Sequence, residues 1–189
     1  MKFASGVSDA VQILQAVTQT CEQVLAQLDG APCHVAWVFA SPIYRSHWNE
    51  AMTILQDRLK PSVLLGCSGS GVIGGEQEFE WVPALSVVAA HLPGVKLYPF
   101  VVSPDELELS SPGGFWVDKV GVVPQEHPVF VLCVDPYTCQ AAKLLDELNA
   151  TFQGCPVIGG LVSGGNEPGE HFLFSDTQVL REGAVGLAM

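Results

Sequence analysis

The sequence is poor in basic residues. Its 189 residues contain eight Lys and Arg against 20 Asp and Glu, which gives a formal net charge of −12. Nucleic-acid binding depends largely on lysine and arginine side chains that neutralise phosphates, and anionic lipid surfaces attract the same side chains. Because the few basic residues are scattered along the chain, we expect neither nucleic acid nor membrane among its partners.

Long apolar runs are also missing, although hydrophobic residues make up 48% of the chain. A membrane-spanning helix needs about 20 mostly apolar residues, and the longest apolar stretch, 84–102, is interrupted by His91, Pro93-Gly94 and Lys96. No apolar core of a secretory signal occurs in the N-terminal stretch MKFASGVSDA. These absences predict a cytoplasmic protein.

Neither a C-x-x-C pair nor the spacing of a structural zinc site occurs among the cysteines. Their even number alone hints at disulfides, but free buried thiols are expected in a chain of this length without a secretory signal. The six cysteines are Cys21, Cys33, Cys67, Cys133, Cys139 and Cys155. We expect no structural metal and no cofactor.

Charged residues of either sign make up only 15% of the chain, compared with about 25% in an ordinary soluble domain. A domain with so few charges has a weakly charged exterior. We therefore expect part of its surface to be covered by another domain or subunit.

The first half of the chain alternates apolar strands with amphipathic helices. Apolar residues at helical spacing lie between Ser8, a candidate N-cap, and Gly30, and again between Pro42 and Pro61. Continuous β-branched and aromatic runs such as HVAWVFA predict buried strands. The expected strands are 2–7, 34–40, 62–65, 84–90 and 97–102.

The second half repeats this order. A helix face runs from Ala141 to Phe152, and the expected strands are 129–134, 156–158, 171–174, 177–181 and 183–189. Pro136 follows Pro42 by 94 positions, and Gly159 follows Gly66 by 93 positions. The nearly constant offset predicts an internal pseudo-repeat over roughly 32–102 and 128–189. The alternative is that α/β proteins reuse such units without duplication.

These elements predict one α/β domain over residues 1–189. Strands connected through a helix are expected to be parallel, with right-handed crossovers, and hairpin-like tails add antiparallel strands. The expected architecture is a mixed, mainly parallel sheet with helices packed on it and antiparallel hairpin additions. Each half of the pseudo-repeat contributes a strand, a helix, a strand, a glycine-rich loop and a hairpin.

The most conspicuous motif is the G-x-G-x-x-G pattern of Gly69 to Gly74, which follows a predicted strand. A dinucleotide site also needs a helix that begins at the glycines and an acidic residue about 20 positions further on. Neither occurs, and no Lys-Ser/Thr follows as in a phosphate-binding loop. The nucleophile pattern G-x-S-x-G fails at Ser70. An enzyme that uses Cys67 or Ser68, a hydrolase or transferase, remains an alternative.

A binding site fits the pattern better. Ser41-Pro42 and Asp135-Pro136 stand where predicted strands end and helices begin. Two glycine-rich loops, 66–75 and 159–165, follow the next strands, at the edge of an α/β sheet where ligands bind. Arg45 is placed to hold a carboxylate. The candidate ligand-binding residues are Ser41, Tyr44, Arg45, Cys67, Ser68, Gly69, Ser70, Gly71, Asp135, Tyr137, Thr138, Gly159, Gly160, Ser163 and Asn166.

The order of four motifs resembles the N-terminal FIST domain over nearly the whole chain. The motifs are FAS-P-x-Y, GCSGSGVIGG, CPVIGGLVSGG and the ending F-x-x-x-x-V-x-x-x-G-A-V-G-L-A. The resemblance implies a sensory domain of bacterial, archaeal and eukaryotic signalling proteins, including F-box proteins, that binds small ligands such as amino acids.

The resemblance also implies partners. FIST modules usually continue into a second, C-terminal FIST domain, which this chain does not contain. The expected partners are therefore a small amino-acid-like ligand and either a C-terminal FIST domain, a signalling output protein or a second copy of the chain. The leading hypothesis is an intracellular sensor of amino acids or related carboxylate metabolites, and a pure protein-interaction module is a further alternative.

Overall fold

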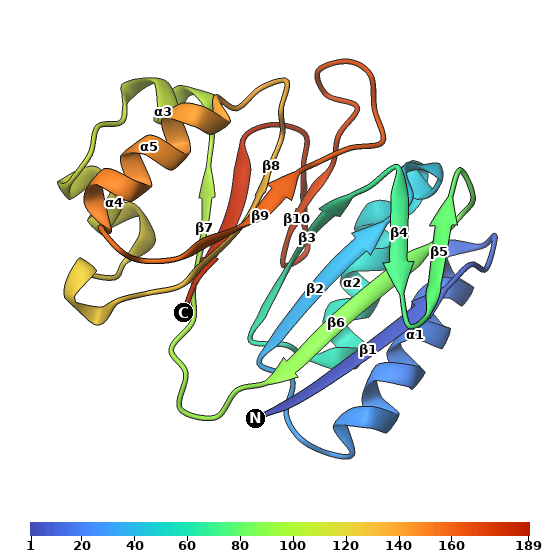
Figure 1. Cartoon of the computed structure of the whole chain (residues 1–189). Coiled ribbons are helices and arrows are strands. Elements are labelled where there is room, and N and C mark those ends of the chain that lie inside the picture. The colour runs from blue at the N-terminus through green and yellow to red at the C-terminus, as the bar shows by residue number, and fades with distance from the viewer.

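Two β-sheets form the framework of the protein, and each carries its helices on the side facing away from the other sheet (Figure 1). The computed structural model describes residues 1–189 without gaps. The six-stranded sheet has the order β1 (Lys2–Ser8), β6 (Leu85–His91), β2 (Val35–Ala40), β3 (Val63–Ser68), β10 (Leu173–Ser175) and β11 (Gln178–Leu180). The four-stranded sheet has the order β7 (Tyr98–Val102), β12 (Ala184–Ala188), β8 (Phe130–Val134) and β9 (Val157–Leu161).

The remaining elements are a small hairpin and the helices. The hairpin pairs β4 (Gly71–Gly74) with β5 (Gln77–Glu80). The α-helices are α1 (Ile13–Leu28), α2 (Trp48–Leu59), α3 (Pro104–Leu109), α4 (Gly114–Val120) and α5 (Ala141–Thr151). Two 3₁₀ helices, η1 (Pro42–His47) and η2 (Pro124–Glu126), complete the chain. No helix is both long and apolar enough to cross a lipid bilayer.

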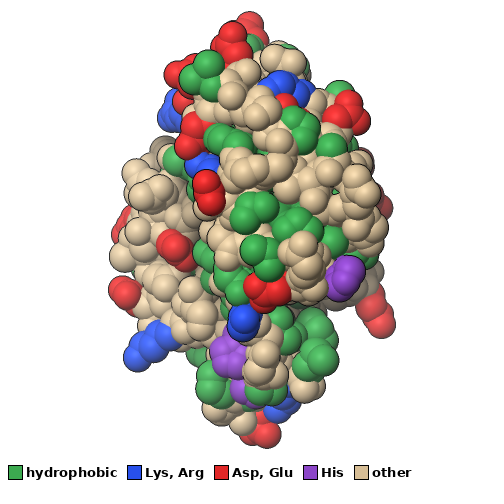
Figure 2. Space-filling view, turned by 90° about the vertical axis from the view of Figure 1, so that its left-hand side faces the viewer, with side chains coloured by type: hydrophobic (Ala, Val, Ile, Leu, Met, Phe, Trp, Pro, Cys, Tyr) green, Lys and Arg blue, Asp and Glu red, His purple; other side chains and the backbone are tan.

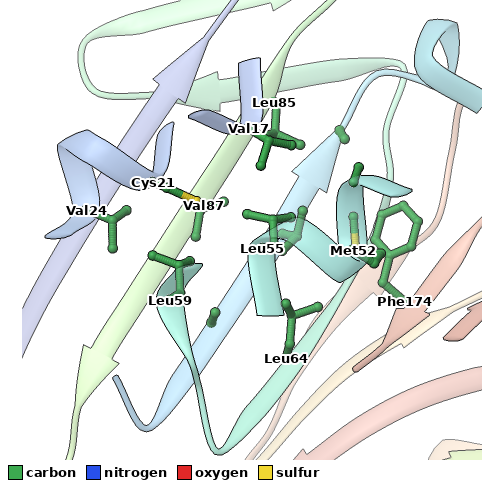
Figure 3. Close-up of a cluster of buried hydrophobic side chains, with 14 of the residues drawn as sticks. Val17, Cys21, Val24, Met52, Leu55, Leu59, Leu64, Leu85, Val87 and Phe174 are labelled. Carbon is green, nitrogen blue, oxygen red and sulfur yellow. The ribbon is translucent and has the colours of Figure 1, made fainter. Parts of the chain in front are cut away.

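The largest apolar core, of 23 buried residues, lies between the six-stranded sheet and helices α1 and α2. Apolar residues three or four positions apart place one stripe of each helix against the sheet. Figure 3 shows Val17 and Val24 of α1 and Leu55 of α2 pointing toward strand residues such as Val87 and Leu64. The predicted amphipathic helices of the first half are thereby confirmed.

A second core, of 16 buried residues, lies between the four-stranded sheet and helices α3 to α5. It encloses the carboxylate of Glu147, which accepts hydrogen bonds from Ser110 Oγ (2.6 Å) and Trp116 Nε1 (2.7 Å) and pairs with Lys143 Nζ (2.8 Å). Burial alone would raise the pKa of Glu147, but the bonds from Lys143, Ser110 and Trp116 outweigh it and leave this pKa lowered. The buried charge is therefore fully partnered.

A third and smaller core joins the two sheets face to face. It contains 11 buried residues, of which three come from β3 and two from β12, while β2, β6, β8 and β10 contribute one each. The connection after β6 also contributes, because Val95 and Leu97 pack against this core. The order of layers is therefore helices, six-stranded sheet, four-stranded sheet, helices.

The mixed α/β class is confirmed, but the expectation of one mainly parallel sheet needs correction. Only the pairs β2–β3 and β8–β9, each connected through a helix as predicted, are parallel. All other pairs are antiparallel. The physical reason is that β6 and β12 return alongside β2 and β8 in the opposite direction. The chain after β6 then leaves the first sheet through the turn at Pro93-Gly94 to begin the second.

The two sheets share one strand order, with β1-β6-β2-β3 in the first corresponding to β7-β12-β8-β9 in the second. Gly66 pairs with Val38 in β3–β2, and Gly159 pairs with Leu132 in β9–β8. This correspondence is what a duplication would produce, and duplication itself stays a hypothesis.

The predicted start of the first helix is wrong. Ser8 ends β1 instead of capping α1, and its hydroxyl contacts the side chain of Gln19 (2.6 Å) and accepts a hydrogen bond from the backbone N–H of Ala10 (3.2 Å). Helix α1 begins at Ile13, after Gln12, whose side chain makes no cap hydrogen bond. The apolar residues before Ile13 misled the prediction because spacing alone does not distinguish a loop from a first helical turn.

Candidate functional site

A cavity of about 430 Å³ lies between the two sheets. Its apolar wall comes from Trp37 and Phe39 of β2 and from Val131 of β8, all of them partly buried. Its polar groups come from Ser68 at the end of β3, from Ser163, and from the backbone of the two glycine-rich loops. An apolar wall with a few polar groups is the usual composition of a small-molecule site.

A second, more polar cavity of about 380 Å³ adjoins the first and shares Ser163 with it. Its lining residues are Ser41, Pro42, Ile43, Ser70, Trp81, Ser163, Gly164, Gly165 and Asn166. We call the first the inter-sheet cavity and the second the loop cavity. The two cavities adjoin at Ser163, and together they give the candidate site an apolar part and a polar part.

Hydrogen bonds among three serines hold the two glycine-rich loops together. Ser68 Oγ donates to the carbonyl oxygen of Ser163 (3.0 Å) and accepts from the backbone N–H of Phe172 (3.1 Å). Ser163 Oγ accepts from the backbone N–H of Ser70 (3.0 Å) and also contacts Ser70 Oγ (3.3 Å). The loops from opposite sheets are thus fixed against each other at the boundary of both cavities.

Ser41 is a cap, as predicted, although of a 3₁₀ helix. Its side chain accepts from the backbone N–H of Ile43 (3.4 Å), and Pro42 is the first residue of η1. The short helix then continues into α2 at Trp48. β2 ends at Ala40, directly before Ser41, and this end of the strand places Ser41 in the wall of the loop cavity.

Asp135 does not begin a helix, which corrects the expectation from Asp135-Pro136. Helix α5 begins six residues later, at Ala141. The fully buried Asp135 carboxylate instead accepts from Thr138 Oγ1, from the backbone N–H of Tyr137 (3.2 Å) and from His171 Nδ1 (2.8 Å). His171 Nε2 in turn contacts the carbonyl oxygen of Gly165 (3.3 Å). This network fastens the second glycine-rich loop to the end of β8.

The structure brings most, but not all, of the candidate residues together. The inter-sheet cavity contains Cys67, Ser68, Gly69, Gly71, Gly159, Gly160 and Ser163, and the loop cavity contains Ser41, Ser70, Ser163 and Asn166. Five candidates line neither cavity, namely Tyr44, Arg45, Asp135, Tyr137 and Thr138. Tyr44 is buried and donates to the carbonyl oxygen of Ala10 (2.6 Å), whereas Arg45 is exposed.

Sequence reasoning missed the apolar wall of Trp37, Phe39 and Val131 and the cysteine Cys133 opposite Cys67. The run HVAWVFA did contain a signal for this wall, because alternate side chains of a strand point to opposite faces and both faces of this run are apolar. One face of β2 meets the helices, and the other meets the cavity. That second face was not recognised because the partner sheet comes from residues far away in the sequence.

The fold and the cavities define a mixed α/β domain with a ligand-sized cleft between two sheets. The FIST N domain family matches residues 34–189, and the chain belongs to this family. FIST domains are generally sensory domains of signalling proteins.

The curated relatives match the whole chain, including residues 1–33, which lie before the region matched by the family. An uncharacterized protein of Mycobacterium tuberculosis (strain ATCC 25618 / H37Rv) is 30% identical over 194 residues, covering 100% of this chain and 48% of the relative. An uncharacterized protein of Mycobacterium bovis (strain ATCC BAA-935 / AF2122/97) is 27% identical over 192 residues, covering 100% of this chain and 47% of the relative. The chain thus spans about half the length of the curated relatives it matches.

Proposed function

We propose that this FIST N domain senses a small metabolite, an amino acid or a related carboxylate, in the inter-sheet cavity and the adjoining loop cavity. The observation that supports the proposal is the junction at Ser163, where an apolar cleft meets a group of hydroxyls and glycine backbone. A ligand with an apolar body and a polar head can satisfy both parts at once.

The charge of the site narrows the ligand class. Neither cavity has a lysine or arginine among its lining residues, and the chain carries a net charge of −12. A ligand with several negative charges would meet an unfavourable field and no cationic partner. We therefore favour a zwitterionic amino acid with an apolar side chain, which would lie against Trp37 and Phe39, with its charged groups near Ser68 and Ser163.

A thermal-shift screen of amino acids, keto acids and nucleotides tests this proposal. A ligand present at a hundred times its Kd stabilises the folded state by about 2.7 kcal/mol, which corresponds to a rise in Tm of about 5–10 °C for a domain of this size. We expect the largest rise with apolar amino acids, and calorimetric titration measures the Kd.

The control for this screen blocks the cavity without disturbing the fold. A side chain at Gly160 would meet open space and would project where the cavity lies, so Gly160→Val should abolish the rise in Tm. Gln178→Val, at an exposed position of β11, should leave it unchanged. A screen without any rise would contradict the sensor and favour the protein-interaction module.

We propose in addition that the exposed edge strand β9 is a surface to which a partner binds. Ile158 and Leu161 are 59% and 61% exposed there, and an unpaired strand edge readily accepts another strand. Hydrophobic side chains also form patches across the helical face of the four-stranded sheet, while acidic side chains gather at its upper end (Figure 2). Because the relatives are about twice as long, we propose that β9 packs against the second half of a full-length FIST protein.

Without that half, the isolated chain is expected to self-associate through β9. Sedimentation velocity at micromolar concentration should show a reversible dimer, and Ile158→Lys should shift it to the monomer because it places a charge on the pairing edge. Leu109→Lys, at an exposed position on α3, is the matched control and should leave the dimer intact. A monomeric wild-type chain at these concentrations would argue against β9 as a partner surface.

A further inference from the structure

Two cysteines from opposite sheets face each other at the inter-sheet cavity. Cys67 lies on β3 and Cys133 on β8, and both line the cavity while only 8% and 6% of their surface is exposed. Both belong to the core between the sheets, and the pKa of each thiol depends on the presence of the other. Both cysteines are free, so the pair is a dithiol.

The other four cysteines lie in different surroundings. Cys21 and Cys33 belong to the core beneath α1 and α2, and Cys139 and Cys155 belong to the core of the four-stranded sheet. Burial raises the pKa of Cys21, Cys33 and Cys139 to about 11 and also raises that of Cys155. None of these four thiols is therefore in the reactive thiolate form at neutral pH.

The two thiols differ in how readily they ionise. The interaction with Cys67 lowers the pKa of Cys133 despite its burial. The interaction with Cys133, together with burial, raises the pKa of Cys67 well above its usual value. The first proton thus leaves Cys133, and thiolates are the form of cysteine that reacts.

We propose that Cys67 and Cys133 form a peroxide-sensitive dithiol that closes reversibly to a disulfide between the two sheets. The Cys133 thiolate attacks one oxygen of a hydroperoxide, so that an S–O bond forms, the O–O bond breaks, and hydroxide or an alkoxide leaves. The Cys67 sulfur then attacks the Cys133 sulfur, so that the S–S bond forms and the S–O bond breaks. The proton of Cys67 leaves with the hydroxyl group as water.

Atoms and electrons balance in this oxidation. With hydrogen peroxide, two thiols and one peroxide give one disulfide and two waters, and a small thiol reverses the change by thiol–disulfide exchange. The cavity supplies the path by which a small peroxide reaches the buried sulfurs. This proposal depends on the two sulfurs alone and is independent of the metabolite.

The architecture permits such a bridge. Facing β-sheets pack about 10 Å apart, and a disulfide between two packed sheets is a regular feature of immunoglobulin domains. Here the two cysteines already belong to one core between the sheets and line the same cavity. Rotation of the side chains and a small approach of the sheets would complete the bond and reshape the wall of the cavity.

The experiment uses the whole chain, first fully reduced and then treated with one equivalent of hydrogen peroxide. Free thiols counted after denaturation are expected to fall from the six of the reduced protein by two. Peptide mapping without reductant should identify a species that joins Cys67 to Cys133, and dithiothreitol should restore both thiols. The oxidised chain should melt about 10 °C higher, because the bond closes a long loop of the unfolded chain.

Variants test the assigned order of attack. In Cys67→Ser we expect a sulfenic acid on Cys133 that dimedone traps, and in Cys133→Ser we expect no adduct on Cys67. Cys21→Ser is the matched control and should form the disulfide as the wild type does. If a serine variant does not fold, Cys67→Ala takes its place, and the wild-type peptide map still decides. Six thiols after treatment, a disulfide between other cysteines, or only irreversible oxidation of Cys133 would each overturn the proposal.

Discussion

Replacing Gly159 by alanine is expected to lower the free energy of unfolding by more than about 4 kcal/mol, a loss that is exceptional for one methyl group. Gly159 lies in β9 directly beside Leu132 of β8, with a φ of +148° that L side chains rarely adopt. An added Cβ would overlap the backbone carbonyl of Leu132. Since this neighbour is the main chain of the paired strand, the two strands would have to separate.

The adjacent residue provides a matched control for this experiment. Gly160 has ordinary φ, and a Cβ there meets nothing within 4 Å, so Gly160→Ala should change the stability by less than about 0.5 kcal/mol. Urea denaturation followed by circular dichroism measures both variants. A Gly159→Ala chain as stable as Gly160→Ala would show that β9 is not held against β8 as described. Gly66, whose Cβ would overlap the carbonyl of Val38, should behave like Gly159.

Removal of the Asp135 carboxylate is expected to cost about 3–5 kcal/mol, because several donors lose their acceptor and an unsatisfied buried polar group costs about 1–3 kcal/mol. Asp135→Ala leaves His171, which is 2% exposed, without its acceptor and also deprives Thr138 of a partner. The free energy of unfolding should fall accordingly. The 165–171 loop should also become more mobile, which hydrogen exchange at its backbone amides can detect.

Two further substitutions separate the network from a simple cap. Asp135→Asn keeps the shape and one acceptor oxygen and should cost less than Asp135→Ala. Ser41→Ala, at the corresponding place after β2, removes a single cap bond and should cost only about 0.5–2 kcal/mol. Equal losses for Asp135→Ala and Ser41→Ala would contradict the network and restore the view of Asp135 as another cap.

The sequence predicted the long helices and most strands because their patterns are local, but the β4–β5 hairpin was missed. The run HVAWVFA, the helical spacing before Gly30, and the parallel pairs connected through α2 and α5 all follow from neighbouring residues. Helices α3 and α4 were missed because six or seven residues do not establish a period. A signal for α3 did exist, since Ser103 and Glu106 form a capping box around Pro104.

The division into two sheets and the site between them were harder to predict. Both depend on which apolar face of β2 or β8 meets which partner, and that choice is made by contacts between residues about a hundred positions apart. The serines and glycines of the loops were found because turn residues have a local signature. Arg45 was included on proximity in sequence, and the turn of η1 leaves it exposed and outside both cavities.

The unequal sizes of the three cores have a mechanical consequence. The two helix-facing cores contain 23 and 16 buried residues, whereas the core between the sheets contains 11. The joint between the sheets is therefore expected to move more readily than either sheet against its own helices. A ligand that enters the cleft, as proposed, is expected to change the angle between the two sheets and to displace the outer helices most. A partner bound to those helices would then respond to the ligand without touching it.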